Sequence, residues 1–426
     1  MLFRLLLLAL LAAPLAPAAA YSVLTHQAVI DSTWERTLLP LLRQHYPGGT
    51  AAELDEAKSY AYGGSILQDL GYYPLGTKLF TNLTHYVRTG DFVANLLRLA
   101  HARNEYAFAL GALAHYAADI VGHPAGTNQI LPTMYPDLRE RFGPVITYEQ
   151  ATKRHTELEF SFDVVQVAAG RYRTQQYHKF IGFRVSEPVL ERAFRATYGL
   201  ELGQVLVNVA ASVATFRFAV NQLLPATARA AWQSQRAEIR RLSPRARRRD
   251  YVYQANPRAF RREFGSGYER PGFGARVMAA VIGGLPKIGP LKTYAFQLPD
   301  AAGEAKFRAS YRATLARFRV LVAQQPADTA TAHALPDINL DTGQPTRPRA
   351  YALADYAYAE LLRELQGHQF EHLTPALRQA LLSFYANGVP TPAQETGHSN
   401  AKTERRAERK RPETEAALAA LRALAR

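Results

Sequence analysis

The sequence predicts an all-α protein. Apolar residues recur at intervals of three and four in "VANLLRLAHARNEYAFALGALAHYAADIV" (residues 93–121), and this spacing is that of a helix face rather than of a strand. The chain has 426 residues, of which 48% are hydrophobic, so it is long enough for one large core or two ordinary ones. The segments "YPGG" (46–49) and "HPAGTN" (123–128) carry turn-forming residues and are expected to end helices.

The first 20 residues, "MLFRLLLLALLAAPLAPAAA", are typical of a secretory signal peptide, with an early Arg, a Leu-rich run and small residues at the end. The apolar run from Leu5 to Ala13 is too short to span a bilayer. An uncleaved membrane anchor is the alternative. Cleavage after Ala20 would make Tyr21 the N-terminus and would place the protein in the periplasm or outside the cell.

Beyond the signal peptide at residues 1–20, three further segments are expected. Residues 21–224 form a helical domain that ends in a buried helix at Val205–Leu224. Residues 225–400 form an additional, mostly helical C-terminal region. This region is Arg- and Pro-rich at first, and amphipathic helix spacing returns between residues 350 and 387. Residues 401–426 are expected to be a charged helix or a frayed tail.

Positive charge is concentrated in the second half of the chain. The net charge is +15, yet basic and acidic residues are equal in number from residue 21 to residue 186. The excess lies in "RAEIRRLSPRARRRD" (236–250) and "AKTERRAERKRPE" (401–413). Each run is either a solvated helix face or disordered tail, or a surface that attracts anionic lipid or nucleic acid.

Metal-binding residue types gather in the first domain. The chain has no cysteine, which excludes disulfides and thiolate sites and leaves His, carboxylate or backbone ligands, a set that suits zinc better than manganese or iron. "ALAHYAADIVGHPAG" (112–126) places His115, Asp119 and His123 four residues apart. This spacing puts them on one helix face, unless Gly122 and Pro124 end the helix first. A buried stripe of this kind requires either a metal or a hydrogen-bonded cluster.

A second helical pair favours a multinuclear metal site. "KRHTELEFSFD" contains His155 and Glu159 at the same i, i+4 spacing. Further upstream, "NLTHYV" contains His85, "GGSILQDLGYYP" contains Asp69, and His26 follows the expected cleavage point closely. After cleavage, the free amine and the carbonyl oxygen of Tyr21 could together chelate a metal.

The order of these ligand types resembles the zinc-dependent phospholipase C superfamily. This group includes bacterial phospholipases C, the catalytic domain of glycosylphosphatidylinositol-specific phospholipase D, and fungal and plant single-strand nucleases. The resemblance covers residues 21–163, extends more weakly to about residue 220, and implies an all-helical catalytic domain at 21–224 with three zinc ions. It implies three ligand sets: Tyr21 and His26 with Asp119 as a bridge, then Asp69, His85 and His115, and finally His123, His155 and Glu159.

Finer spacing distinguishes the branches of the superfamily. The H-x3-D-x3-H pattern looks most like the glycosylphosphatidylinositol phospholipase D catalytic domain and its bacterial relatives, because the other branches typically have a longer second gap. The final Glu159 is similar to the phospholipases C, whereas the nucleases have Asp. Two positions depart from the family pattern: Tyr21 replaces the usual Trp, and Gln68 stands where relatives often have Pro.

The resemblance implies a secreted zinc-dependent phosphodiesterase that hydrolyses phospholipid head groups with zinc-activated water. Asp69 is expected to act as a ligand and as a general base. A single-strand nuclease and a non-catalytic metal-binding protein are the alternatives. Tyr72, Tyr73 and Tyr86 either contact a cationic head group or a base, or pack in the core. Peripheral contact with an anionic membrane surface is also expected.

Overall fold

The computed structural model describes residues 22–73, 75–168, 183–206, 208–218, 236–237, 239–241, 244, 298–326, 334–390 and 401–424. Every regular element within these residues is a helix, which confirms the all-α prediction. The first part of the chain contains α2 (Val23–Thr33), η1 (Trp34–Leu38), α3 (Leu39–His45), α4 (Ala51–Gly64), η2 (Gln68–Tyr72), α5 (Lys78–Tyr86), α6 (Thr89–Arg98), α7 (Arg103–Gly122), η3 (His123–Thr127), α8 (Asn128–Met134), α9 (Pro136–Phe142), α10 (Tyr148–Ala168), α12 (Glu187–Tyr198), α13 (Leu202–Val205) and α14 (Val209–Phe218). The second part contains α19 (Ala301–Ala323), α20 (Ala352–Gly367), α21 (Pro375–Phe384), α22 (Ala401–Arg409) and α23 (Arg411–Ala423).

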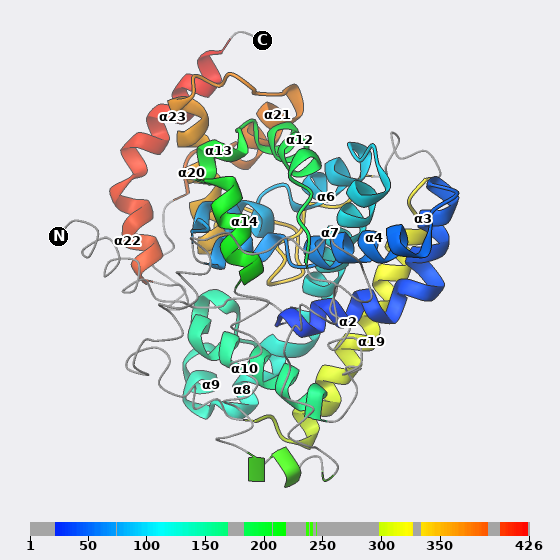
Figure 1. The fold of residues 1–426 in the computed structure, drawn as a ribbon. Helices are drawn as coiled ribbons and strands as arrows, with labels where there is room; N and C mark the ends of the chain where they lie inside the picture. Colours follow the sequence, from blue (N-terminus) through cyan, green and yellow to red (C-terminus); the bar gives the residue numbers. More distant parts are fainter. Residues whose placement is uncertain are drawn as a thin grey trace, which may run out of the picture.

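Helix α7 lies at the centre of the bundle (Figure 1). Each residue from Tyr106 to Asp119 is buried, because α2, α4, α6 and α19 pack around it. A helix that is covered on all sides has no polar face to present to water. The sequence meets this condition with an almost continuous apolar run, and the polar exceptions in its second half are His115 and Asp119.

Two glycines allow α4 and α7 to approach closely. A Cβ atom on Gly64 would lie 1.9 Å from the carbonyl oxygen of Phe108, and one on Gly111 would lie 2.2 Å from that of Ala61. Any larger residue would push the helices apart. This close approach carries the carbonyl of Ser65, which follows α4, to the imidazole of His115 on α7.

The C-terminal region shares the core of the first domain. One buried hydrophobic cluster contains Phe108 of α7 together with Phe318 of α19, Leu361 of α20 and Leu418 of α23. Helix α19 packs along α7, and α20 packs against α5 (Figure 1). The hydrophobic core therefore extends across the predicted boundary at residue 224.

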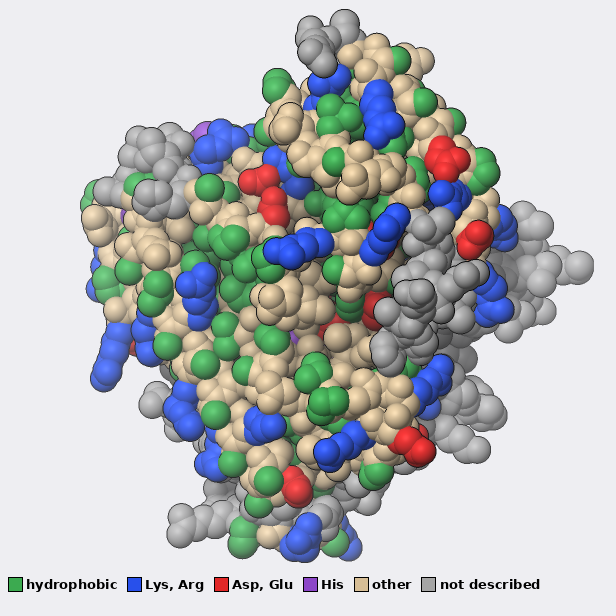
Figure 2. All heavy atoms as spheres, turned by 180° about the vertical axis from the view of Figure 1, so that it is seen from behind, with side chains coloured by type: hydrophobic (Ala, Val, Ile, Leu, Met, Phe, Trp, Pro, Cys, Tyr) green, Lys and Arg blue, Asp and Glu red, His purple; other side chains and the backbone are tan. Residues whose placement is uncertain are grey.

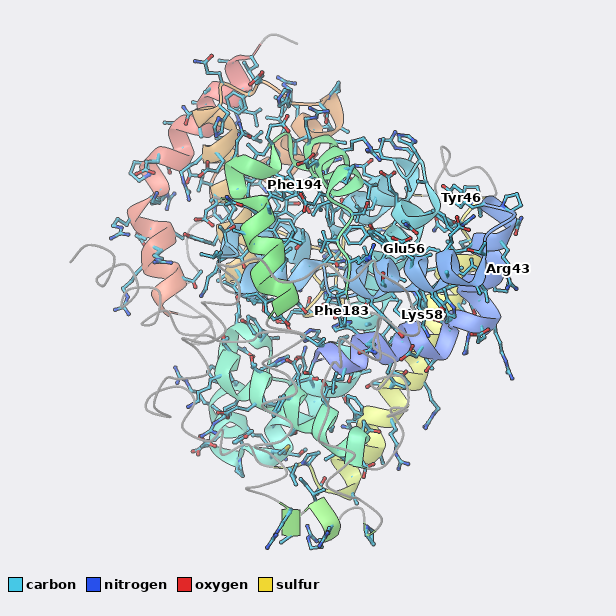
Figure 3. The ribbon with its side chains drawn as sticks, viewed as in Figure 1. Arg43, Tyr46, Glu56, Lys58, Phe183 and Phe194 are labelled. Atoms are coloured by element: carbon cyan, nitrogen blue, oxygen red, sulfur yellow. The ribbon has the colours of Figure 1, made fainter. Side chains whose placement is uncertain are left out.

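Helix α12 closes the bundle beside α5 and α6. Phe194 of α12 stacks on Phe80 of α5 with the ring centroids 5.6 Å apart, and Phe183, just before the helix, packs on Tyr62 of α4 (Figure 3). Among the described residues, no helix is long and apolar enough to cross a membrane. The predicted signal peptide, Tyr21 and most of the basic run at residues 236–250 lie outside the described residues.

Candidate metal centre

The predicted side-chain ligands are all buried inside the bundle. Asp69, His115, Asp119 and His155 have no exposed surface, and His26, His85, His123 and Glu159 are each exposed by 4% or less. They come from α2, η2, α5, α7, η3 and α10. The structure brings them into three groups of three: His26, Asp69 and His115; His85, His115 and Asp119; and His123, His155 and Glu159. The first two share His115, so we call them together the Asp119 group, and we call the third the Glu159 group.

Asp119 is the centre of its group. One carboxylate oxygen, Oδ2, lies 3.0 Å from Nε2 of His115 and 3.6 Å from Nε2 of His85. The other oxygen, Oδ1, lies 3.7 Å from Nε2 of His26. The two oxygens of Asp119 therefore face different imidazoles. Asp69 completes the group, with Oδ1 lying 3.4 Å from Nε2 of His85.

The start of α2 is held in place by a residue to which the sequence motifs assign no role. Asp163 of α10 accepts hydrogen bonds from the amide of Leu24 at 3.0 Å and from the hydroxyl of Thr25 at 2.6 Å. These bonds anchor α2 against α10 and bring His26 over the metal centre, where its ring stacks on His115 at a centroid distance of 4.3 Å. In the sequence, Asp163 stands one helical turn after Glu159.

The Glu159 group forms where the α-helical path of α7 gives way to a π-helical turn. Helix α7 ends at Gly122, yet the chain continues as one π-helical turn from His123 into α8, so Pro124 does not break the helical path. Single π turns are frequent at functional sites. The ring of His123 stacks on that of His155 at 5.0 Å, and Nδ1 of His155 lies 2.8 Å from Oε1 of Glu159.

Hydrogen bonds on the outer side of three imidazoles fix their orientation. Nδ1 of His115 bonds the carbonyl of Ser65 at 2.9 Å, and Nδ1 of His85 bonds the carbonyl of Thr81 at 2.9 Å. Nε2 of His155 bonds the side-chain oxygen of Asn128 at 2.8 Å. Such contacts select the tautomer in which the opposite ring nitrogen carries a lone pair for a metal.

The carboxylates of both groups fit a bound cation. Both side-chain oxygens of Asp69, Asp119 and Glu159 are buried and accept no hydrogen bond from the described residues. Buried polar atoms normally have partners, and an unpartnered buried carboxylate is costly. Imidazole nitrogens and carboxylate oxygens in such groups are the ligands that zinc takes in proteins without thiolates. The residues present therefore fit the implied metal.

The pKa values of the ligand side chains also favour a bound cation. Burial raises the pKa of Glu159 well above its usual range and also raises that of Asp69. Burial opposes the charged form of His115, but Asp119 and Asp69 outweigh it and raise the pKa of His115 to about 9. Burial is the main cause of the lowered pKa of His26. A cation would satisfy the carboxylates without requiring these protons.

Besides Asp163, the structure adds two residues that sequence reasoning missed. Asp341, between α19 and α20, places Oδ1 at 3.0 Å from Nδ1 of His123. Asn128 is the partner of His155 described above. Asp341 lies in "DINLDTGQP" (337–345), where acidic and turn-forming residues alternate without ligand spacing, so only its mixture of Asp, Asn and Gly gives a signal.

Comparisons with known proteins give one match. A search of curated proteins and a search of solved structures each returned nothing similar. Residues 25–206 match the family model described as zinc dependent phospholipase C, and this segment contains every member of the Asp119 and Glu159 groups. The match supports assignment of this segment to the zinc-dependent phospholipase C superfamily. It thereby supports, for this segment, a function like that of a zinc-dependent phosphodiester hydrolase.

Proposed function

We propose that the protein is a secreted zinc-dependent phosphodiesterase that hydrolyses phospholipid head groups in the manner of a phospholipase C. One observation carries the proposal. Two adjacent, buried groups of imidazoles and carboxylates lie within the segment that matches the zinc dependent phospholipase C family, and the carboxylates of Asp69, Asp119 and Glu159 lack a hydrogen-bond partner among the described residues. The relation to the glycosylphosphatidylinositol phospholipase D branch and the secretion of the protein are parts of the same proposal.

The ligand groups have the chemistry that such hydrolysis requires. Bound zinc lowers the pKa of a coordinated water to about 7 and neutralises the oxygens of a phosphodiester. The side chains of the Asp119 group would hold the ions close together, with Asp119 between them and with the backbone of Tyr21 as an additional ligand. Asp69 is assigned a second role as general base, because its buried carboxylate lies beside His85 and accepts no hydrogen bond from the part of the chain that the structure describes.

Two tyrosines support a lipid head group as the substrate. The ring of Tyr72 lies 6.1 Å from that of His85, and the ring of Tyr148 lies 5.7 Å from that of His155 and 6.1 Å from Tyr72. Both are partly exposed beside the metal centre, a position from which an aromatic face attracts a quaternary ammonium group. Tyr86, in contrast, is 1% exposed and packs on Tyr351, so we assign it to the core.

The basic surface supports contact with a polyanion. Figure 2 shows Lys and Arg side chains spread over one face among hydrophobic side chains, with acidic side chains less frequent there. An anionic membrane is the partner that we propose for this charge. Nucleic acid would be attracted by the same charge, which makes single-strand nuclease activity the second candidate.

The test combines metal content with hydrolysis. Wild-type protein beginning at Tyr21 is compared with His115→Ala and with the control His101→Ala, whose side chain is exposed outside both groups. We expect zinc in the wild type and in the control, less zinc in His115→Ala, and release of phosphorylated head group from phosphatidylcholine vesicles only where zinc is retained. Release of the unphosphorylated head group would indicate D-type cleavage, and hydrolysis of single-stranded DNA alone would favour the nuclease. Absence of zinc from metal-replete wild-type protein would overturn the proposal.

A further inference from the structure

The segment between α19 and α20 is attached to α7, which carries candidate metal ligands, and to the neighbouring helix α6. Thr89 of α6 bonds both backbone groups of Ile338, accepting from its amide at 3.0 Å and donating to its carbonyl at 2.7 Å. The amide of Gly90 donates to Asp337 at 2.9 Å, and the hydroxyl of Tyr116 on α7 donates to the carbonyl of Pro336 at 2.7 Å. The segment is therefore fixed on α6 and α7 before it reaches Asp341.

A tight turn then presents Asp341. The side-chain oxygen of Asn339 accepts the amides of Asp341 at 3.0 Å and of Thr342 at 3.2 Å. Gly343 has φ +67°, and a Cβ atom there would lie 2.7 Å from the carbonyl oxygen of Ile120 on α7. A left-handed backbone in such close contact requires glycine. The turn thus lies directly against the end of α7, where the Glu159 group begins.

The two oxygens of Asp341 have different partners. Oδ2 accepts a hydrogen bond from the amide of Tyr148 at 3.0 Å and another from the hydroxyl of Tyr351. These bonds fix the carboxylate plane and leave Oδ1 directed at the metal centre. Oδ1 lies at ion-pair distance from His123, 3.0 Å from its Nδ1, and 3.9 Å from Nε2 of His155.

The same turn reaches two further ligands through hydrogen bonds. The amide of Leu340 donates to the carbonyl of His85 at 3.0 Å. The side-chain amide of Asn128 donates to the carbonyl of Asp341 at 2.7 Å, while its oxygen contacts Nε2 of His155 at 2.8 Å. A single turn outside the family-matched residues 25–206 therefore touches ligand residues of both groups, directly or through one intervening side chain.

We propose that Asp341 is a positioning residue of the Glu159 group and that the C-terminal region completes the metal centre. Asp341 holds Nδ1 of His123 and leaves Nε2 of that ring for the metal. A carboxylate behind a ligating histidine orients the ring and makes it a stronger ligand, and its loss typically lowers metal affinity by about 10- to 100-fold. This inference rests on the proposed function, because it requires that the Glu159 group binds zinc.

The matched control lies on the same turn. Asp337 is half-buried, and its carboxylate bonds the amides of Gly90 and Asp91 rather than a ligand. We compare zinc affinity in full-length wild type, Asp341→Asn and Asp337→Asn by chelator competition, and check that the zinc-free proteins have equal helix content. Asp341→Asn is expected to weaken the binding of one ion by about 10- to 100-fold, while Asp337→Asn remains within about threefold of wild type.

A double-mutant cycle shows whether Asp341 acts through His123. In the His123→Ala background, Asp341→Asn is expected to have no further effect on zinc affinity, because the ring that it positions is absent. Additive effects of the two substitutions, or equal affinities of Asp341→Asn and Asp337→Asn, would overturn the inference. If wild-type protein bound no zinc, the proposed function would fail instead, so the two failures are distinguishable.

Discussion

The close approach of α4 and α7 provides a test of how the fold positions the metal centre. In Gly64→Ala the new Cβ would lie 1.9 Å from the carbonyl oxygen of Phe108, whereas ordinary contacts begin at 3.4 Å. The obstacle is backbone, so no side chain can rotate away, and the helices must separate locally by roughly 1.5 Å, an overpacking that typically costs about 1–3 kcal/mol. We expect a value near the upper limit, partly offset by up to about 1 kcal/mol from the better helix propensity of Ala.

Gly203→Ala is the matched control. Gly203 lies within helix α13, is exposed, and would place its Cβ where no atom lies within 4 Å. This substitution is expected to stabilise the protein by about 0.4–1 kcal/mol, because Ala restricts the unfolded chain. The two variants should therefore differ by roughly 2–3 kcal/mol in free energy of unfolding, measured by urea denaturation followed with far-UV circular dichroism.

The same substitution should also affect the metal centre. Separation of α4 from α7 moves the carbonyl of Ser65 away from Nδ1 of His115, which it bonds at 2.9 Å. Loss of such an outer contact typically weakens metal binding by about 10- to 100-fold. We expect weaker zinc binding in Gly64→Ala and unchanged binding in Gly203→Ala. Equal stability of the two variants would refute the reasoning that the helix contact requires glycine.

Three further predictions follow from burial and charge. Burial raises the pKa of Glu149 to about 8. Its contribution to the free energy of unfolding is therefore complete below the unfolded pKa of about 4.5 and is lost as the pH rises through 8. Glu149→Gln should remove this loss, so the variant should have a higher melting temperature than wild type at pH 8.5 but not at pH 4. Removal of zinc by a chelator should lower the melting temperature, and zinc at about 100 times its Kd should restore about 2.7 kcal/mol. Tyr72→Ala should raise KM for phosphatidylcholine with little change in kcat, whereas Tyr72→Phe should keep KM near wild type, because the cation–π contact requires the ring alone.

The parts of the site that depend on local geometry could be predicted from the sequence. His115 and Asp119 lie four residues apart on one helix, as do His155 and Glu159, and helix geometry places such pairs on one face. The all-α class followed from the same periodicity. Asp69 lies on a short 3-10 turn without any periodic pattern, so only the order of the family motif indicated it.

Contacts between distant segments could not be predicted in this way. Asp341 reaches His123 from a turn in the least periodic part of the chain, and no spacing rule connects the two positions. The core shared by the two parts of the chain could not be predicted for the same reason. Periodicity shows that the amphipathic helices of the C-terminal region require a buried partner, but it does not identify the helix that provides it. The structure shows that α19 packs along α7 and α20 against α5, across the predicted boundary at residue 224.

The position of the ligands would couple the proposed zinc binding to folding. Helix α7 is buried at every residue from Tyr106 to Asp119, and it carries both core residues and the central carboxylate, Asp119. Without a cation, folding must bury carboxylates whose oxygens have no hydrogen-bond partner among the described residues, at a cost for each one. Bound zinc would offset this cost only in the folded state, so its binding energy would contribute directly to stability. Loss of the metal alone would lower both the activity and the stability of a ligand variant. Its activity must therefore be compared with that of wild type under conditions in which both proteins are folded.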